Sequence, residues 1–559
     1  IYDNHDFDPS WSVLDLNYRT GGWDIIGKLV YYNQHSYQIS DQMSGNTFVK
    51  MPDGSVKHNL MEGPFAFIGH NSGISGDLGL NWQINENHSL GMKMNYGGML
   101  FGNQDIVFED NVYANDELID IVHSASHTTT PSSHTFTGNI YYDGNINKLH
   151  VNFNADFSDS GYKKETNVNE NSQNNPAFIE NLSDGVARMG AGKLVLSYPI
   201  WKGMFKIGTE ETYVTAKQEY NSTKTEIPSS KAKITENNIS GFAEYALPFK
   251  YVQVVAGIRY EHVDFEYTNE CSPKDNINRT HNNWFPSFNA STKIGPVGIN
   301  LGYTTKIKRP RYDQLSTELQ YNNRFLYQTG DPTLLNEIQN TLSLNANWRW
   351  LTLTGAYEVV DNAIYQLGYP YDDDCTAMVK YSNAKETVRK LNIYLNASPT
   401  VGIWNPRYTV GMEKQYFETT VIDPRESTGT RVVKRNDPMF FVQANNSFKL
   451  KQGWLIDLDY QYTSPFDYVM YKFTKPKHGL NLAVSKSFLK HDALNVRLAW
   501  NDILNKTKEH VCTDYGNFIH NQNNNYYAPS VQLRLSYRFN TANSKYKGTG
   551  AGQDAKNRM

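Results

Sequence analysis

Cysteine, charge and long apolar runs are all scarce in this chain of 559 residues. Its 3 cysteines are too few, and odd in number, for a disulfide framework. The mean hydropathy is -0.60, and no apolar run approaches the roughly 18 residues that a membrane-spanning helix needs. The net charge is -4 and no long basic block occurs, so the sequence lacks the electrostatic signature of a nucleic-acid-binding protein.

Aromatic residues, by contrast, make up 13% of the chain, with 38 Tyr, 26 Phe and 10 Trp. This composition is rich in strand formers. A low mean hydropathy is compatible with membrane-spanning strands, because apolar and polar residues alternate along them and their hydropathies average out. Residues 1–4 lack the basic start and apolar stretch of a secretion signal, so for an exported protein we expect the true N-terminus to lie upstream.

The clearest strand lies near the C-terminal end of the sequence. Apolar side chains occupy every second position there: Val531, Leu533, Leu535, Tyr537 and Phe539. Because side chains point alternately to the two faces of a strand, one face is apolar and the other polar or charged. Residues 14–19, 454–462 and 494–500 divide in the same way. Two architectures fit this pattern: a soluble sandwich or propeller with its apolar faces inward, and a lipid-facing barrel with those faces outward.

The links between the strands favour the barrel. Short links, such as residues 85–88, 295–296 and 451–453, alternate with long ones, such as residues 33–73, 101–133 and 306–337. Short turns on one side and long loops on the other are typical of outer-membrane barrels, in which the short side is periplasmic. The sequence therefore predicts an all-β, transmembrane antiparallel β-barrel over residues 1–540, with long extracellular loops, and a periplasmic C-terminal tail over residues 541–559.

The strand count makes the prediction more specific. The pattern gives about 21 strands, whereas single-chain bacterial barrels have even numbers. The first strand, residues 11–18, leads into a short turn and therefore descends from the outside. We expect one ascending strand to be missing before it, so that the intact barrel has about 22 strands. Barrels of that width enclose a lumen that a separate domain plugs.

Three segments in the C-terminal half resemble the barrels of TonB-dependent receptors. There, an Arg-Pro element and a Gly-Asn-Pro-x-Leu-x-Pro-Glu element flank an extracellular loop, and an Asp-Ile-Phe-Asn element precedes the last loop. The matching residues here are Arg309, Pro310, Tyr312 and Leu315, then Gly330, Pro332, Leu334 and Glu337, then Asp502 and Asn505. Asp331, Asn336 and Leu504 depart from the family pattern. Residues 545–553 are similar to the ending of the Bacteroidota branch of outer-membrane barrels.

The resemblance implies a receptor in the outer membrane of a Gram-negative bacterium of the Bacteroidota. It implies an N-terminal plug domain, absent from this chain, that contacts the TonB complex. It also implies import of a scarce ligand: an oligosaccharide, a metal chelate or a peptide. A surface lipoprotein is a possible further partner. Two alternatives remain open: a passive pore or adhesion barrel without a plug, and a soluble β-rich glycan-binding protein.

Candidate binding and assembly residues follow from the same reading. Aromatic loop residues, which could stack on sugars or cap an iron chelate, are Tyr321, Tyr327, Tyr369 and Tyr371. Aromatic residues also form the girdles at both membrane interfaces, which is the plainer explanation. The last strand, with Leu533, Leu535, Tyr537 and Phe539, resembles the terminal signal that the barrel assembly machinery recognises.

Metal and catalytic sites are not expected. His123, His127 and His134, with Asp116 and Glu117, have no recognised ligand spacing, and a solvated loop explains them better. Asp372, Asp373 and Asp374 lack the Gly and the later Glu of a dedicated calcium loop. Cys375 and Cys512 could pair or remain free thiols. Neither Gly-x-Ser-x-Gly nor His-Glu-x-x-His occurs, so the sequence predicts no enzyme and no cofactor.

Overall fold

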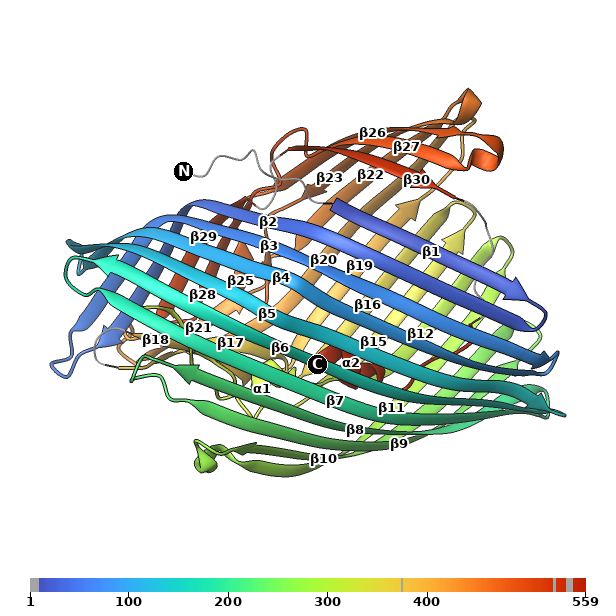
Figure 1. Ribbon diagram of the computed structural model, residues 1–559, viewed down its shortest axis with the longest axis horizontal. Coiled ribbons are helices and arrows are strands. Elements are labelled where there is room, and N and C mark those ends of the chain that lie inside the picture. The colour runs from blue at the N-terminus through green and yellow to red at the C-terminus, as the bar shows by residue number, and fades with distance from the viewer. Residues whose placement is uncertain (1–9, 373–375, 526–528, 539–545) are drawn as a thin grey trace.

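The computed structural model describes residues 10–372, 376–525, 529–538 and 546–559 (Figure 1). Most of the described chain forms one curved antiparallel wall. Its strands are β1 (Ser10–Thr20), β2 (Trp23–Lys50), β3 (Val56–Asn85), β4 (His88–Ala114), β5 (Glu117–Ile146), β6 (Leu149–Ser172), β7 (Ala177–Ile200), β8 (Gly203–Ser222), β9 (Ser230–Pro248), β10 (Val252–Asn269), β11 (Ile277–Ile294), β12 (Val297–Lys308), β15 (Glu337–Trp348), β16 (Leu351–Asp361), β19 (Val388–Ala397), β20 (Trp404–Ile422), β22 (Met439–Lys449), β23 (Trp454–Thr463), β26 (Lys477–Phe488), β27 (Leu494–Asn501) and β30 (Ser530–Tyr537).

Each of these wall strands pairs antiparallel with the next one in this order, from β1 to β30. Every strand expected from the sequence overlaps one of them. The predicted fold class, an all-β protein with a large antiparallel sheet, is therefore confirmed. Among the described residues, β1 pairs with β2 alone and β30 pairs with β27 alone, so the wall has two edges there.

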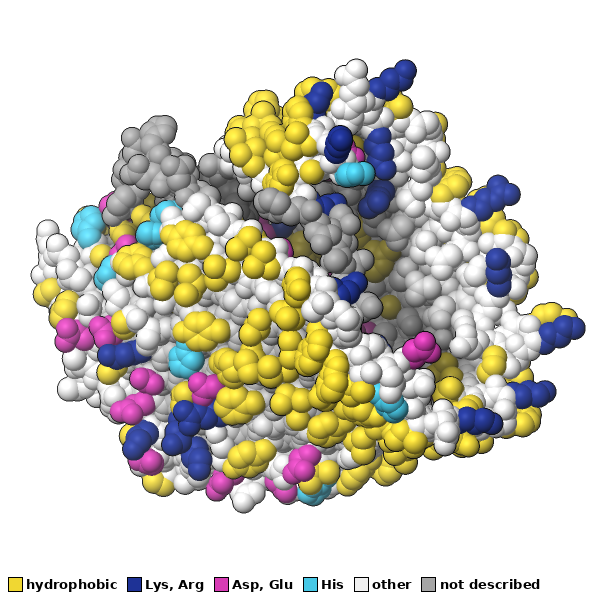
Figure 2. Space-filling view, turned by 45° about the vertical axis from the view of Figure 1, so that its right-hand side comes forward, with side chains coloured by type: hydrophobic (Ala, Val, Ile, Leu, Met, Phe, Trp, Pro, Cys, Tyr) yellow, Lys and Arg dark blue, Asp and Glu magenta, His cyan; other side chains and the backbone are white. Residues whose placement is uncertain are grey.

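Alternation along the strands sorts the side chains between the two faces of the wall. Leu498, Leu533 and Ile207 project outward and are about half exposed or more. The polar residues between them face inward, as shown by Arg497 on β27, whose guanidinium forms an ion pair with Asp457 on β23. Figure 2 shows a broad band of hydrophobic side chains across the outer face, and a hollow beside it. Such a band is too large for a face that contacts water, so it requires an apolar surrounding phase.

The long links differ from the expected loops, because several of them continue the wall as paired strands. Between residues 33 and 73, β2 and β3 remain paired up to a short turn at residues 51–55. β4 and β5 likewise extend through most of residues 101–133. Backbone hydrogen bonds hold these extensions together whatever the side-chain pattern. Their polar composition concealed them from a reading based on alternation. We call this end of the wall the long-hairpin end, and the opposite end the short-turn end.

Smaller strands complete the long-hairpin end. They are β13 (Gln320–Asn323), β14 (Leu326–Thr329), β17 (Ile364–Pro370), β18 (Ala377–Asn383), β21 (Thr430–Arg435), β24 (Phe466–Tyr468), β25 (Tyr471–Phe473), β28 (Glu509–Asp514) and β29 (Phe518–Asn525). β29 pairs with the extension of β2, and β28 with β25, so the wall is joined here across the interval between β1 and β30. β13, β14, β18 and β17 form a separate sheet, in which β14 and β18 are parallel.

Two short helices lie inside the wall (Figure 1). They are α1 (Tyr312–Leu315), in the link between β12 and β13, and α2 (Gln553–Arg558), near the C-terminus. Three single-turn 3-10 helices are found at Pro273–Asp275, Lys451–Gly453 and Lys490–Asp492. Among the described residues, the helices are all too short or too polar to span a membrane.

Candidate functional site in the barrel lumen

A row of carboxylates crosses the inner face of the wall from β6 to β10. Its members are Asp156 on β6, Glu210 on β8, Glu236 on β9 and Glu261 on β10. Alternation places them on the inner face, where Glu210 and Glu261 are both paired with Ser240 of β9 and Glu236 lies four residues from that position on the same strand. Asp156, Glu236 and Glu261 are buried. Buried carboxylates are costly unless cations or hydrogen-bond donors compensate for them, so this row predicts partners close by.

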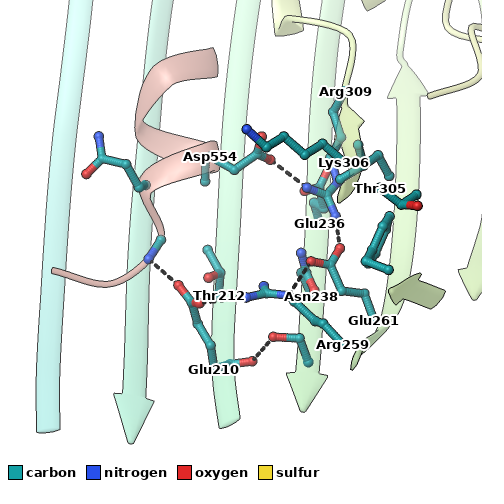
Figure 3. A pocket seen from close by; sticks show the side chains of 16 residues that line it. Glu210, Thr212, Glu236, Asn238, Arg259, Glu261, Thr305, Lys306, Arg309 and Asp554 are labelled. Atoms are coloured by element: carbon teal, nitrogen blue, oxygen red, sulfur yellow. Dashed lines mark hydrogen bonds and ion pairs between the residues drawn. The ribbon is translucent and has the colours of Figure 1, made fainter. Parts of the chain in front are cut away.

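Arg309 is the central cation of this site. It directly follows β12, and its side chain is only 3% exposed. One guanidinium nitrogen forms a buried ion pair with Glu261, and another lies 2.7 Å from Oδ2 of Asp554 on α2 (Figure 3). Nε of Arg259 also donates to Glu261, at 2.7 Å. The planar, multivalent guanidinium explains why arginine suits this bridging position.

Arg558, at the end of α2, provides the second cation. Its guanidinium donates two hydrogen bonds to the carboxylate of Glu236, at 2.8 and 3.0 Å, and a third to the carbonyl oxygen of Pro310, at 3.0 Å. It also lies over the ring of Tyr312, 4.6 Å from the ring centre. Burial alone would lower the pKa of Arg558, but the Glu236 carboxylate outweighs burial and raises it. The guanidinium therefore remains charged in this buried position.

A cavity of about 280 Å³ lies beside this network. Its lining combines carboxylates, cations and neutral polar groups, among them Glu210, Thr212, Asn238, Lys306 and Asp554 (Figure 3). Oδ1 of Asn238 is buried and has no hydrogen-bond partner among the described residues. Hydrogen-bond donors and acceptors and side chains of both charges line this cavity. It therefore suits a small polar solute or ordered water better than an apolar molecule.

The two loop motifs recognised in the sequence meet beside Arg309. Tyr312, Leu315 and Leu334 are almost fully buried in one apolar cluster. A Cβ on Gly330 would clash with the backbone oxygens of Gln314 and Ser316, which explains the glycine. Pro332 is buried next to this turn.

Glu337 closes the same loop at the start of β15. Its Oε1 accepts a hydrogen bond of 2.6 Å from the backbone N–H of Ile364, and Nζ of Lys308 lies 3.2 Å from its Oε2. The loop motifs are thus structural elements that fold residues 309–337 back into the barrel.

A family model described as the outer membrane protein beta-barrel family matches residues 144–537. The chain belongs to this family. It is accordingly a protein of the outer membrane of a Gram-negative bacterium, and the apolar band on its wall faces lipid. The likeness to receptor barrels that the sequence motifs predicted is confirmed at the level of family and fold. The Bacteroidota origin remains a prediction.

Solved outer-membrane transporters share the fold. The copper transporter OprC has a TM-score of 0.55 and 10% identity, over 89% of this chain and 85% of its own. YddB from Escherichia coli has a TM-score of 0.54 and 9% identity, over 92% and 76%. The FrpB iron transporter from Neisseria meningitidis has a TM-score of 0.52 and 11% identity, over 88% and 82%. No curated protein matches this outer-membrane barrel.

The third motif of this family member lies apart from the Arg309 site. Asp502 and Asn505 form a turn after β27, in which the N–H of Asn505 donates to the carbonyl of Asp502 at 2.9 Å. The Asp502 carboxylate accepts a 2.6 Å hydrogen bond from the hydroxyl of Thr507. In the last strand, Leu533, Leu535 and Tyr537 are exposed, whereas Phe539 lies outside the described residues.

The four candidate tyrosines differ in their surroundings. Tyr321 and Tyr327 are buried together, and the hydroxyl of Tyr321 donates to Glu170 at 2.7 Å. The hydroxyl of Tyr369 lies 3.3 Å from that of Ser382. Tyr371 is 37% exposed, with its ring edge-on to Tyr327 at 4.9 Å. Of the four, Tyr371 offers the largest open ring surface to a ligand.

The histidines considered as metal ligands lie on β5, not in a loop. Nδ1 of His127 lies 2.6 Å from Asp105, and Nε2 of His134 lies 3.0 Å from Asp159. In the described part of the chain, no group of three or more His, Cys, Asp or Glu side chains is placed to hold a metal ion.

The cysteine and aspartate candidates are only partly covered. Within the described ranges, Cys271 and Cys512 are free thiols. Asp373, Asp374 and Cys375, which the sequence offered as a weak calcium candidate and as a thiol that could pair with Cys512 or stay free, lie outside the described residues.

The C-terminal segment differs most from expectation. A periplasmic tail is predicted for residues 541–559, but residues 546–559 lie along the inner face of the wall, where Lys556 and Arg558 bind the carboxylate row and Asp554 binds Arg309. These charged residues were missed as site residues because local alternation does not report their distant partners. The row itself could have been found from acidic residues at inward positions of adjacent strands.

Proposed function

We propose that this chain is the barrel of a TonB-dependent outer-membrane receptor that imports a scarce ligand. The proposal rests on one observation: a loop, residues 309–337, is folded into the lumen and bound to the polar inner wall through buried ion pairs. The chain is a member of an outer-membrane barrel family. Import through such a lumen needs recognition and gating, and no catalytic group. The short-turn end is periplasmic and the long-hairpin end extracellular, as in other outer-membrane barrels.

The ligand class is proposed from two sources: transporters of the same fold, and the polar and aromatic residues of the lumen and its loops. Two transporters of the same fold carry copper and iron in their names, which favours a metal chelate. The exposed ring of Tyr371 would stack on a sugar, and the cavity beside Arg309 has room for one small polar group of an oligosaccharide or a peptide. We therefore propose a polar ligand from these three classes.

The edges of the wall support a missing strand. β1 leads into the short turn at residues 21–22, and β30 pairs antiparallel with β27, which follows a short turn. β1 and β30 therefore run in the same direction and cannot pair antiparallel with each other. One strand of opposite direction between them would close a barrel of about 22 strands. We propose that the intact protein supplies this strand and, before it, the plug that contacts the TonB complex.

Two other partners belong to the proposal. The barrel assembly machinery would recognise the exposed apolar residues Leu533, Leu535 and Tyr537 as the terminal-strand signal. A surface lipoprotein would cover the long-hairpin end. The soluble glycan-binding alternative is excluded, because the apolar faces of the strands point outward in a member of an outer-membrane family.

Conductance and uptake distinguish an importer from a passive pore. The complete native protein is extracted from the outer membrane, its mass is measured, and its conductance in planar bilayers is compared with that of residues 1–559. A plugged importer is larger than this chain and almost closed, and removal of the plug opens it. In cells, deletion of TonB abolishes uptake of ferric chelates, copper, oligosaccharides or peptides that depends on this gene. A native protein without a plug that conducts freely would refute the importer and establish the passive pore.

A further inference from the structure

The C-terminal segment runs along the inner face of the wall, away from its short-turn end. It begins near the short-turn end, where Nζ of Lys547 lies 3.3 Å from Asp143 on β5. The backbone N–H of Thr549 then donates to Asn154 on β6 at 3.1 Å. The segment ends with Arg558 bonded to Pro310, at the opposite end of β12. Residues 546–559 therefore follow the inner face from the short-turn end to the level at which β12 ends.

The wall provides matched partners along this path. The N–H groups of Ala551 and Gly552 donate to Asp156 and Glu210, both at 2.8 Å. Lys556 forms an ion pair with the same Asp156. Most of the carboxylate row thus accepts charged or polar groups of this segment, which compensates for its burial.

Glycine allows the segment to lie flat on the wall. Gly550 and Gly552 have φ of +74° and +63°, a backbone conformation that L side chains rarely adopt. A Cβ on Gly552 would approach Sδ of Met189 to 2.6 Å and Cβ of Ala191 to 2.9 Å. Neither the backbone conformation nor the space at this position admits another residue without strain.

The inner face also carries an apolar patch where a water-filled lumen should be polar. Its members come from β7 to β10: Ala187, Met189, Val214, Ala216, Ala232, Ile234, Phe265 and Tyr267. Ala555 of α2 packs on this patch together with Tyr312, Leu315 and Leu334 of the inward-folded loop. The segment and the loop therefore complete one core, and each covers apolar surface that the other needs.

We propose that residues 546–559 are a lumenal strap that holds the loop of residues 309–337 folded into the barrel. The strap reaches this loop through Asp554, which binds Arg309, and through Arg558, which binds Pro310 and Tyr312. Because the loop lies across the path to the outer mouth, the strap sets how far that path is open. This role does not depend on the identity of the imported ligand.

Disulfide trapping tests where the strap lies in the complete protein in its own membrane. The native cysteines are changed to serine, and Thr549→Cys in the strap is combined with Asn154→Cys on β6, whose side chain is hydrogen-bonded to that of Thr549 at 3.1 Å. Oxidation is expected to link the two positions, and mass spectrometry identifies the joined peptides. The matched control combines Thr549→Cys with Ala483→Cys, buried on β26 elsewhere in the ring, and should not link. Failure of the first pair to link, or equal linking of both pairs, would overturn the proposal.

Charge reversal tests whether the strap holds the loop. Arg558→Glu breaks the pair with Glu236, whereas Arg558→Glu combined with Glu236→Arg restores it with opposite signs. Hydrogen exchange of residues 309–337 is expected to become at least about tenfold faster in the single variant and to recover in part in the double variant, which restores the ion pair with the wall but not the hydrogen bond to Pro310. The control, Lys434→Glu, breaks the exposed pair with Glu418 and should change nothing. If the cysteine pair links but loop exchange in Arg558→Glu is unchanged, the strap lies in the lumen without holding the loop, and the holding role is wrong. Heat-modifiable gel migration confirms that each variant is folded.

Discussion

Arg324 offers the sharpest quantitative test of how the inner loop is held. It lies between β13 and β14, and its side chain is 12% exposed. Its guanidinium donates to Asp120 at 3.0 Å and to Glu170 at 3.3 Å, and both of these carboxylates are buried. Arg324→Ala leaves two buried charges without their cation, a type of change that costs about 3 to 5 kcal/mol.

The remaining donors reduce this cost. Asp120 keeps the hydroxyl of Ser172 and the N–H of Ile121, and Glu170 keeps the hydroxyl of Tyr321 at 2.7 Å. We therefore expect the lower end, about 3 kcal/mol, which raises the population of the released loop about a hundredfold. Arg324→Lys keeps a point charge that cannot serve both carboxylates, so we expect about 1 to 2 kcal/mol.

Proteolysis of intact cells measures this population. Chymotrypsin is expected to cleave after Phe325 and Tyr327 when the loop is released, at a rate that follows the open fraction. Arg311→Ala is the matched control, because that arginine is 54% exposed and pairs with the exposed Asp313, a contact worth less than about 1 kcal/mol. If Arg324→Ala were cleaved no faster than this control, the buried network would not hold the loop.

Three further predictions concern the same loop and the outer face of the wall. Burial raises the pKa of Glu318 to about 7. Ionisation of Glu318 therefore destabilises the folded loop increasingly as the pH rises above about 4.5, and fully above pH 7. Glu318→Gln should slow amide exchange of this loop about tenfold or more at pH 8 and leave it unchanged at pH 4. Gly330→Ala should cost about 2 kcal/mol or more, measured by the same exchange, because its Cβ meets the backbone oxygen of Gln314. Ile207→Arg, on the outer face of β8, should lower the free energy of unfolding in lipid vesicles by about 2 kcal/mol, whereas Lys206→Arg, on the inner face, should change it by less than about 0.5 kcal/mol; equal effects would contradict the assigned faces.

Prediction from the sequence succeeded where the signal is local. Alternation at residues such as Leu498 and Leu533 fixes which face of a strand is apolar, because successive side chains always point to opposite sides. The loop motifs were also visible, and Arg309 was singled out. Its partners Glu261 and Asp554 were not, since they lie 48 and 245 residues away in the sequence.

Local patterns failed where pairing alone defines the structure. The extensions of β2 to β5 carry little alternation, and they are strands only because a neighbouring strand satisfies their backbone hydrogen bonds. β14 and β18 belong to two separate loops and pair in parallel, and the sequence of neither loop predicts this pairing.

The sequence by itself determined strands with one apolar and one polar face, because successive side chains of a strand point to opposite sides. That the apolar faces point outward, toward lipid, follows from the structure and the family. Only the tertiary structure decided where the last residues lie. Curving the wall brings inward carboxylates from β6 to β10 into one row, and two of them, Asp156 and Glu236, are compensated by cations from the chain's other end, Lys556 and Arg558. A segment read as a periplasmic tail therefore lies in the lumen, beside the loop that it completes.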